Sequence, residues 1–296
     1  MNPIYQFPDS PKRLASLMSE YQFYPKKKLG QNFLIDSNIT KIIVKALSLK
    51  DNDIIFEIGT GMGILTKELM SSAKNVFSIE KDLRLKPILN HLFPEDNEKV
   101  TIFYEDILDF DLAGFLKEKK SEGFLLNKIT GNLPYAISLP LLKKIMEMHY
   151  LLKMAVVMVQ KEVAERMMAK PGNKNYGLLS IISQYYASIE KVHLVKPDVF
   201  YPQPEVNSMI IRINFFDKPA VYVEDESLFF DLLHAVFQHR RKKLTNALNL
   251  YFGDKIDKNQ LEKSLQELKI EKNERGETFN LQKFACLTSA IKKIMK

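Results

Sequence analysis

The fold of this chain is indicated by one stretch, Ile54-Ile55-Phe56-Glu57-Ile58-Gly59-Thr60-Gly61-Met62-Gly63. A short apolar run is followed at once by a glycine-rich turn, and the apolar spacing over residues 64–70 is that of an amphipathic helix. Glycines at positions 59, 61 and 63 allow positive φ and bring the backbone close to a ligand at the helix N-terminus. The stretch therefore predicts a strand, a tight turn and a helix beside a ligand.

The spacing of these glycines argues against a nicotinamide dinucleotide as that ligand. A dinucleotide-binding turn has its third glycine one position later, where this chain carries Ile64. A glycine turn alone is as compatible with a structural bend as with a ligand site. The interpretation therefore depends on the residues that follow.

Further apolar runs follow the turn, and two of them end in acidic residues. Residues 75–79 end in Glu80, and residues 100–104 end in Glu105 and Asp106. Carboxylates at successive strand ends are typical of a parallel sheet that binds a ligand at its carboxyl edge. We predict further strands at 124–130, leading into Asn132, at 154–159 and, as a closing strand, at 208–215, with a helix at 161–168.

Glu80 and Asp106 turn the glycine motif into a prediction of an adenosine site. Glu80 ends the next strand, roughly 20 residues on, where a carboxylate can accept both ribose hydroxyls. Asp106 can accept from the amino group of an adenine. Taken singly, each acid is better explained as a solvated strand end. In register with the glycine turn, the two acids favour a ligand that contains adenosine.

A second motif, Asn132-Leu133-Pro134-Tyr135, predicts which group is modified. The side-chain carbonyl of Asn132 and the backbone carbonyl of Leu133 or Pro134 can accept the two hydrogens of an exocyclic amine. Pro134 fixes its own φ and removes a competing donor. Tyr135 supplies a flat face for the purine that carries the amine. The alternative interpretation is an ordinary turn from strand to helix.

Composition excludes several classes of protein. The 296 residues are 46% hydrophobic, enough for a buried core, yet no stretch approaches the roughly 18 uncharged apolar residues of a membrane helix. The first 25 residues have no apolar core, so we expect no secretory signal and a cytoplasmic protein. The single cysteine, Cys286, excludes an internal disulfide and a cysteine-rich zinc site. We expect no metal.

Charge and periodicity indicate a second domain. The formal net charge is +7, and the basic runs Lys26-Lys27-Lys28 and Arg240-Arg241-Lys242-Lys243 stand out, although such runs are more often solvated faces than nucleic-acid sites. Past a linker at 217–219 the pattern changes to helices without strands, predicted at 227–237, 242–251, 259–268 and 280–295. We divide the chain into an extension (1–25), an α/β domain (26–217) and a helical domain (218–296).

Together these motifs resemble the S-adenosylmethionine-dependent methyltransferases, and more specifically the ribosomal RNA adenine N6-dimethyltransferase family. Besides the glycine turn, the resemblance lies in Lys28-Leu29-Gly30-Gln31-Asn32-Phe33-Leu34, in Asn132 to Tyr135, in Phe200-Tyr201-Pro202-Gln203-Pro204-Glu205-Val206-Asn207-Ser208 and in Phe237-Gln238-His239-Arg240-Arg241-Lys242-Lys243-Leu244. It implies an α/β, Rossmann-like methyltransferase domain followed by a small all-helical domain that binds RNA. Glu205 departs from the family pattern, which commonly has lysine at this position. A lysine there could contact an RNA phosphate, and a glutamate argues against such a contact.

The resemblance also assigns site residues. It implies S-adenosylmethionine as methyl donor, held by Asn32, Leu34, Gly59, Glu80, Asp106 and Asn132 together with Gly61 of the glycine turn. Catalysis is expected at Asn132, Leu133, Pro134, Tyr135 and Phe200, with the Phe200 ring on the adenine face opposite Tyr135. Taken alone, the Phe200 segment is also typical of a rigid surface loop. RNA contacts are expected at Arg240, Arg241, Lys242 and Lys243.

The implied reaction is dimethylation of N6 on two adjacent adenosines in a small-subunit ribosomal RNA hairpin, by a monomer acting on the immature subunit. One alternative is the macrolide-resistance methyltransferase of large-subunit ribosomal RNA, whose catalytic loop is closely similar. A second is a ribosome-assembly factor that uses the same basic surface without catalysis. A DNA adenine methyltransferase is disfavoured, because the sequence shows no separate target-recognition domain.

Overall fold

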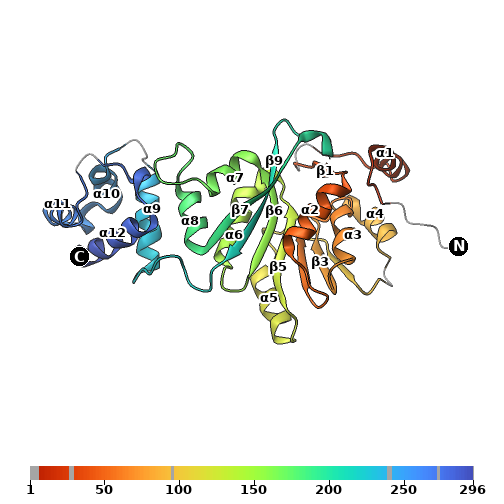
Figure 1. Ribbon diagram of the computed structural model, residues 1–296, viewed down its shortest axis with the longest axis horizontal. Coiled ribbons are helices and arrows are strands. Elements are labelled where there is room, and N and C mark those ends of the chain that lie inside the picture. Colours follow the sequence, from red (N-terminus) through yellow and green to blue (C-terminus); the bar gives the residue numbers. More distant parts are fainter. Residues whose placement is uncertain (1–6, 27–29, 95–96, 239–241, 272–273, 296) are drawn as a thin grey trace. The chain divides into compact units, whose positions relative to one another are not determined.

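The computed structural model describes residues 7–26, 30–94, 97–238, 242–271 and 274–295 (Figure 1). The chain divides into two compact units. The first comprises Met1–Ala164 and Ile189–Phe215, and the second comprises Glu165–Ser188 and Phe216–Lys296. Within the described ranges, no helix is both long enough and apolar enough to cross a membrane.

The first unit is built on a seven-stranded sheet, formed by β2 (Ile54–Ile58), β3 (Asn75–Ile79), β4 (Val100–Phe103), β5 (Leu126–Asn132), β6 (Met154–Gln160), β7 (Ala187–Val195) and β9 (Ser208–Phe215). The strand order is β4-β3-β2-β5-β6-β9-β7. Neighbours from β4 to β6 are parallel, whereas β9 runs antiparallel to β6. The chain order reverses between β2 and β5, the place where open α/β sheets bind ligands. The α/β prediction is confirmed.

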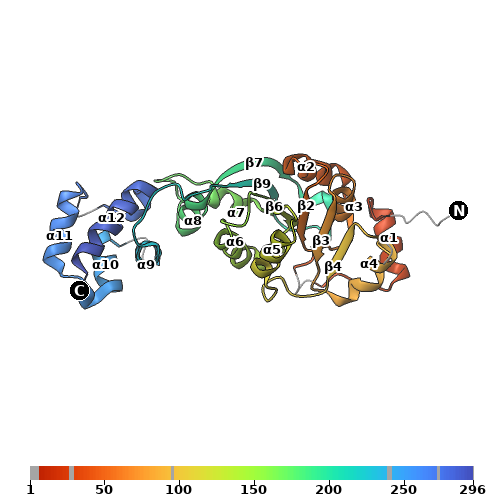
Figure 2. The same cartoon turned by 90° about the horizontal axis from the view of Figure 1, so that it is seen from below.

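Helices cover both faces of this sheet, which is why all five residues of β2 are buried. Helices α2 (Ser37–Leu47) and α3 (Ile64–Met70) pack on one face through a core that includes Ile43, Leu69 and Val156. On the opposite face, α5 (Leu112–Ser121) packs Phe115 against the rings of Phe56, Phe77 and Phe103. Figure 2 shows α2 and α3 on one side of the sheet and α5, with α6 (Ser138–Glu147), on the other.

The N-terminal residues contribute to the core of the first unit. Helix α1 (Pro11–Glu20) begins at a Ser10 cap and buries Leu14, Leu17 and Met18 against α4 (Lys86–Leu92). Phe23 belongs to the same cluster and contacts the ring of Phe33, with ring centroids 5.8 Å apart. Burial of these side chains stabilises a segment for which the sequence offers no motif.

Two short strands, β1 (Phe33–Leu34) and β8 (Phe200–Tyr201), form a separate antiparallel pair in which Leu34 is opposite Phe200. Helix α7 (Lys161–Met167) directly follows β6. Single turns of 3-10 helix lie at Leu83–Leu85, Tyr135–Ile137, Pro197–Val199, Gly253–Lys255 and Gly276–Thr278.

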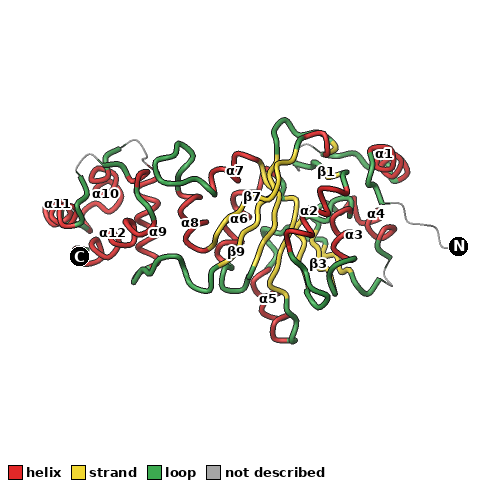
Figure 3. Tube along the Cα trace, viewed as in Figure 1, coloured by secondary structure: helices red, strands yellow, loops and turns green. Residues whose placement is uncertain are grey.

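The second unit contains α8 (Leu178–Tyr186), α9 (Glu226–Gln238), α10 (Leu244–Phe252), α11 (Lys258–Glu267) and α12 (Leu281–Ile294). Its core holds buried side chains such as Phe229, Leu248 and Phe284. Beyond Phe216 the described chain is drawn as helices and loops alone (Figure 3), as the all-helical prediction requires. The four predicted helices correspond to α9 to α12.

Two predicted segments of this region can be compared with the structure. The predicted linker at 217–219 lies just after the point where the chain passes from the first unit to the second, at Phe215 and Phe216. The residues on either side of it bond to the end of α8, because Phe216 N donates to Tyr186 O (2.9 Å) and Ala220 N donates to Tyr185 O (2.8 Å). Helix α10 begins at Leu244, so Lys242 and Lys243 lie before the helix, where both are exposed.

Candidate active site

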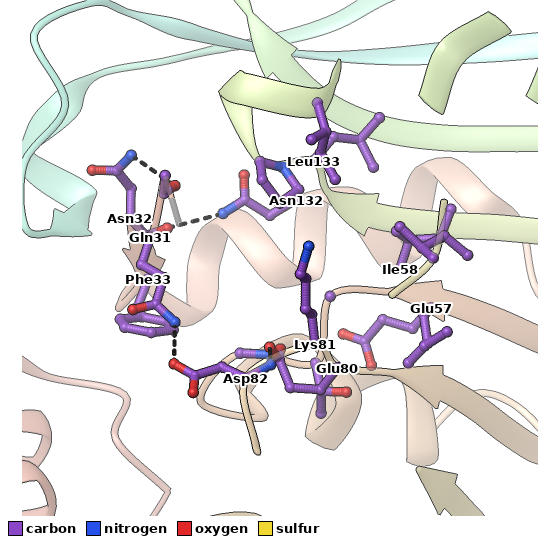
Figure 4. A pocket seen from close by; sticks show the side chains of 18 of the residues that line it. Gln31, Asn32, Phe33, Glu57, Ile58, Glu80, Lys81, Asp82, Asn132 and Leu133 are labelled. Atoms are coloured by element: carbon purple, nitrogen blue, oxygen red, sulfur yellow. Dashed lines mark hydrogen bonds between the residues drawn. The ribbon is translucent and has the colours of Figure 1, made fainter. Parts of the chain in front are cut away.

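A cavity of about 200 Å³ lies at the carboxyl edge of β2, β3 and β5 (Figure 4). Strand ends and the loops after them form its walls, where a sheet of this topology binds ligands. Among its lining residues are the predicted Asn32, Leu34, Gly59, Gly61, Glu80, Asp106, Asn132, Leu133, Pro134 and Tyr135. The structure thus brings every predicted cofactor residue, and all four residues of the catalytic loop, to one cavity.

The glycine turn folds against the end of the neighbouring strand. Gly59 N and Thr60 N both donate to Ile79 O, at 2.9 and 3.2 Å. Gly61 has a φ of 54°, and a Cβ added there would lie 3.3 Å from the ring of Phe33, which also lines the cavity. A side chain at Gly61 would therefore be strained and crowded, and glycine leaves this backbone open to a ligand.

Glu80 is held in one orientation by backbone donors. Its Oε2 accepts from Gly61 N (2.9 Å) and its Oε1 from Asp82 N (2.8 Å). Only 8% of the residue is exposed, and this burial raises the pKa of Glu80 above its usual value, while the two hydrogen bonds lower it. Each carboxylate oxygen keeps capacity for a further donor, such as a ribose hydroxyl.

The segment before β1 is tied to the loop that follows Glu80. Gln31 Nε2 donates to Asp82 Oδ2 (2.7 Å), and Asp82 also pairs with Arg84 (2.5 Å). Burial alone would raise the pKa of Asp82, but the hydrogen bonds from Arg84 and Gln31 lower it below the usual value. Sequence reasoning missed both Gln31 and Asp82. The available signal was position, because both stand within two residues of a predicted site residue.

Asp106 follows β4 and carries a fixed carboxylate. Its Oδ1 accepts from Leu108 N (3.0 Å), and its Oδ2 forms an ion pair with Lys81, whose side chain is largely exposed. Burial raises the pKa of Asp106, but the hydrogen bonds from Lys81 and Leu108 outweigh it and lower the pKa. The group that faces the cavity is therefore an ionised acceptor.

The catalytic loop continues β5 into α6. Asn132 Nδ2 donates to Asn32 O (3.1 Å), as Figure 4 shows, so the amide oxygen of Asn132 is turned away from that carbonyl. Leu133 N donates to Met158 O (3.0 Å), which extends the pairing of β5 with β6. Pro134 O accepts from Ile137 N (3.1 Å) and is already engaged.

Tyr135 is anchored by the first residue of β9. Its hydroxyl lies 2.5 Å from Ser208 Oγ, and Ser208 is fully buried. Burial raises the pKa of Tyr135, and the Ser208 contact lowers it. This bond joins the catalytic loop to the end of the segment Phe200 to Ser208. Sequence reasoning quoted Ser208 as part of a motif without giving it a role.

Phe200 is the predicted site residue that the structure does not bring into the cavity wall. It is 1% exposed and packs in the core with Ile39, Ile43 and Val156. The strand pair explains this placement, because Leu34 opposite it lies in the same core cluster. The neighbouring Tyr201 is 48% exposed. Contact of the Phe200 ring with an adenine stays a prediction.

The predicted RNA-binding run is only partly described. Arg240 and Arg241 lie outside the described residues, whereas Lys242 and Lys243 are exposed between α9 and α10. Among the residues that the structure describes, no group of three or more His, Cys, Asp or Glu side chains could hold a metal ion.

Comparison with known proteins gives consistent matches over most of the chain. A sequence model of the family described as "Ribosomal RNA adenine dimethylase" matches residues 22–286. A "Ribosomal RNA small subunit methyltransferase A" of Bacillus cytotoxicus is 42% identical over 284 residues, which cover 95% of this chain and 96% of that protein.

Two solved structures are also similar. A dimethyladenosine transferase from Plasmodium falciparum has a TM-score of 0.76 at 26% identity, covering 89% of this chain and 99% of that one. The 23S rRNA methyltransferase ErmE has a TM-score of 0.64 at 20% identity, covering 88% and 100%, which shows the same fold.

Proposed function

This chain belongs to the ribosomal RNA adenine dimethylase family, and we propose that the cavity beside Asn132 is where it carries out methyl transfer. The protein is an S-adenosylmethionine-dependent methyltransferase that dimethylates adenine in small-subunit ribosomal RNA. Methylation of large-subunit RNA is not favoured, because the 42% identical relative is named for the small subunit, whereas the 23S enzyme shares 20% identity. We further propose two adjacent adenosines of a hairpin as the target.

The cavity fits S-adenosylmethionine by its acceptors and by its bare backbone. Glu80 would accept from the ribose hydroxyls, and Asp106 from the amino group of the adenine. Gly59 and Gly61 would lie against the methionine portion, flanked by Asn32 and Leu34. When bound, S-adenosylmethionine supplies a sulfonium methyl group that a weak nucleophile can attack.

The residues of the catalytic loop would make adenine N6 such a nucleophile by holding it. Its lone pair is delocalised into the ring, so the amine must be oriented and partly rehybridised. Asn132 Oδ1 and one backbone carbonyl would accept the two hydrogens. Because Pro134 O would have to share its two lone pairs between Ile137 N and the amine, we assign the second acceptor to Leu133. Positioning of this kind supplies up to roughly 7 to 11 kcal/mol without a protein acid or base. After N6 has accepted the methyl group, it releases one proton to solvent.

Tyr135 would stack on the captured adenine, with its ring held through Ser208. Base stacking on an aromatic side chain contributes roughly 1 to 3 kcal/mol per base, comparable to the cost of unstacking an unpaired nucleotide. Phe200 keeps its proposed place on the other face, which requires the ring to leave the core. Phe200→Ala should then weaken adenine capture more than cofactor binding. Unchanged RNA affinity with unchanged turnover would remove Phe200 from the site.

The RNA partner would be the immature small ribosomal subunit, bound by a monomer in the cytoplasm. RNA phosphates would be neutralised by four basic residues of the helical domain, the exposed Lys242 and Lys243 together with Arg240 and Arg241. Charge reversal at Arg240 and Arg241 should weaken association with ribosomal RNA and flatten its dependence on salt. An unaltered salt slope would contradict this assignment.

The observation that carries the proposal is the gathering of Glu80, Asp106 and Asn132 around one cavity from three separate strand ends. The test incubates the protein and radiolabelled S-adenosylmethionine with one substrate at a time: immature small subunits, large subunits or DNA. Primer extension then locates the methylated nucleotides. Label in the small subunit alone, at adjacent adenosines, is expected.

The matched variants are Asn132→Ala and Asn127→Ala, which change asparagines at opposite ends of β5. We expect Asn132→Ala to lose about 100-fold or more of turnover, with fold and RNA affinity retained, and Asn127→Ala to remain active. Full turnover in Asn132→Ala would exclude Asn132 from the mechanism. If Asn132→Ala nevertheless rescued the growth defect of a deletion strain, the essential role would be subunit assembly.

A further inference from the structure

One lysine connects the helix that follows the catalytic loop to the turn that follows Asp106, and both the loop and Asp106 line the cavity. Lys144 of α6 donates from Nζ to Ile107 O (2.8 Å), Leu108 O (3.0 Å) and Phe110 O (2.7 Å). An ammonium group has three N–H donors, and here all three end on backbone carbonyls of a single turn. The Nζ atom of its neighbour Lys143 lies 3.8 Å from Glu147 Oε1, and the Lys143 side chain is 69% exposed.

The turn that Lys144 holds is the one that orients Asp106. Asp109 N and Phe110 N both donate to Asp106 O, at 3.0 and 2.9 Å, and Leu108 N donates to the Asp106 carboxylate. The carbonyls of this turn point toward the ammonium, as the last carbonyls of a helix do toward a cationic cap. The positive charge also lowers the pKa of the Asp106 carboxyl.

Lys144 also belongs to the helix that follows the catalytic loop. Ser138 Oγ, in the first turn of α6, donates to Tyr135 O (3.1 Å). The Lys144 side chain therefore starts on the helix that follows the catalytic loop, and its ammonium group binds the turn after Asp106. Apolar contacts secure the far side of that turn, where Phe110 lies 5.4 Å from Phe103, centroid to centroid.

We propose that Lys144 is a positioning residue that fixes the Asp106 carboxylate at the exocyclic amine of the cofactor's adenine, and so makes the site selective for a 6-amino purine over a 6-oxo purine. The inference rests on the proposed function. Without Lys144, the turn would keep its Phe110 anchor but lose the constraint on its carbonyls. Asp106 would then accept the amine in a wider range of positions and discriminate less against a carbonyl at the same place.

Calorimetry with two product analogues tests this directly. S-adenosylhomocysteine carries the 6-amino group, and S-inosylhomocysteine carries an oxygen there. We expect the wild type to bind the amino analogue at least tenfold more tightly, Lys144→Met to reduce that ratio to threefold or less, and Lys143→Met to retain it. In the Asp106→Asn background, Lys144→Met should change the ratio no further.

A purely structural role predicts a different result. Equal losses for both analogues in Lys144→Met, or a ratio that falls again in the Asp106→Asn background, would overturn the inference and leave the proposed function standing. A wild type that binds neither analogue would overturn both. If Lys144→Met does not fold, Lys144→Gln retains two donors without the charge. It should show an intermediate ratio and faster hydrogen exchange at the Leu108 amide, and an unchanged ratio would refute the proposal.

Discussion

Replacing Glu57 by glutamine should remove a pH-dependent part of the free energy of unfolding. Glu57 is fully buried, its Oε2 accepts from the hydroxyls of Thr66 (2.6 Å) and Ser78 (2.9 Å), and its Oε1 has no partner among the described residues. Burial raises the pKa of Glu57 to about 8, the two hydroxyls oppose the rise, and the Glu80 carboxylate adds to it. The folded protein therefore keeps Glu57 protonated near neutral pH.

The size of the effect follows from the pKa difference. The usual value is 4.5 and the folded value is about 8. At about 1.36 kcal/mol per unit, the rise corresponds to about 5 kcal/mol. Below pH 4.5 both states carry the proton, and the stability is undiminished. Between pH 4.5 and about 8 the unfolded state releases a proton that the folded state keeps, so stability falls by about 1.4 kcal/mol per unit.

Urea unfolding at pH 5, 6, 7 and 8 measures this slope. The difference in unfolding free energy between Glu57→Gln and the wild type should change by about 1.4 kcal/mol per pH unit in favour of the variant as pH rises. Unsatisfied amide donors in the variant add a pH-independent offset only. The raised pKa of Glu80 affects both proteins and largely cancels. The exposed Glu20→Gln serves as control. Parallel stability curves for Glu57→Gln and the wild type would refute the reasoning.

Three further changes test individual contacts. Ser208→Ala should cost about 1 kcal/mol of stability, lower turnover, and raise the pKa of Tyr135 in an ultraviolet titration, and an unmoved titration would contradict the anchoring role. Asp82→Asn should weaken the hydrogen bonds that Asp82 accepts from Gln31 and Arg84, which as charged bonds are worth about 1.5 to 3 kcal/mol. Because Gln31 would then be held less firmly, mass spectrometry of this variant should show faster hydrogen exchange at Phe33 and Leu34, and exposed Asp51→Asn should show no change. Lys128→Met should destabilise the fold by about 3 to 5 kcal/mol, because buried Asp53 loses its partner at 2.6 Å. Adding Asp53→Asn should recover part of that loss in urea, and no recovery would mean that the charge is not the cause.

The sequence predicts the centre of the sheet well, because local signals define it. β2, α3, β3 and β9 have the predicted bounds. β2 and β3 are apolar runs ended by Gly59 and by Glu80, α3 has helical apolar spacing, and β9 alternates apolar and polar residues over most of its length. β7 was missed, because Glu190 and Lys191 interrupt its apolar pattern and both are exposed. An edge strand of that composition is specified by its neighbour in the sheet rather than by its own periodicity.

The same distinction separates the site residues that the sequence reveals from those it hides. Glu80, Asp106 and Asn132 could be predicted because each lies at or just after the end of a strand, and strand ends meet at one edge of the sheet. The bonds Gln31 to Asp82 and Tyr135 to Ser208 join residues 51 and 73 positions apart. No periodicity encodes such pairs. The burial of Phe200 likewise depends on the pairing of β8 with β1, which places Leu34 opposite it. Strands of two residues are too short to be recognised from a periodic pattern in the sequence.

These long-range bonds form a closed circuit around the cavity. Asn132 binds the carbonyl of Asn32, Gln31 binds Asp82, and the loop of Asp82 shares the Glu80 carboxylate with Gly61. The pairing of β2 with β5 returns the circuit to Asn132. The amine acceptors and the cofactor acceptors are thereby positioned relative to one another by the fold itself. Because a mechanism without acid or base depends on that geometry, breaking any link in the circuit should impair cofactor binding and amine alignment together.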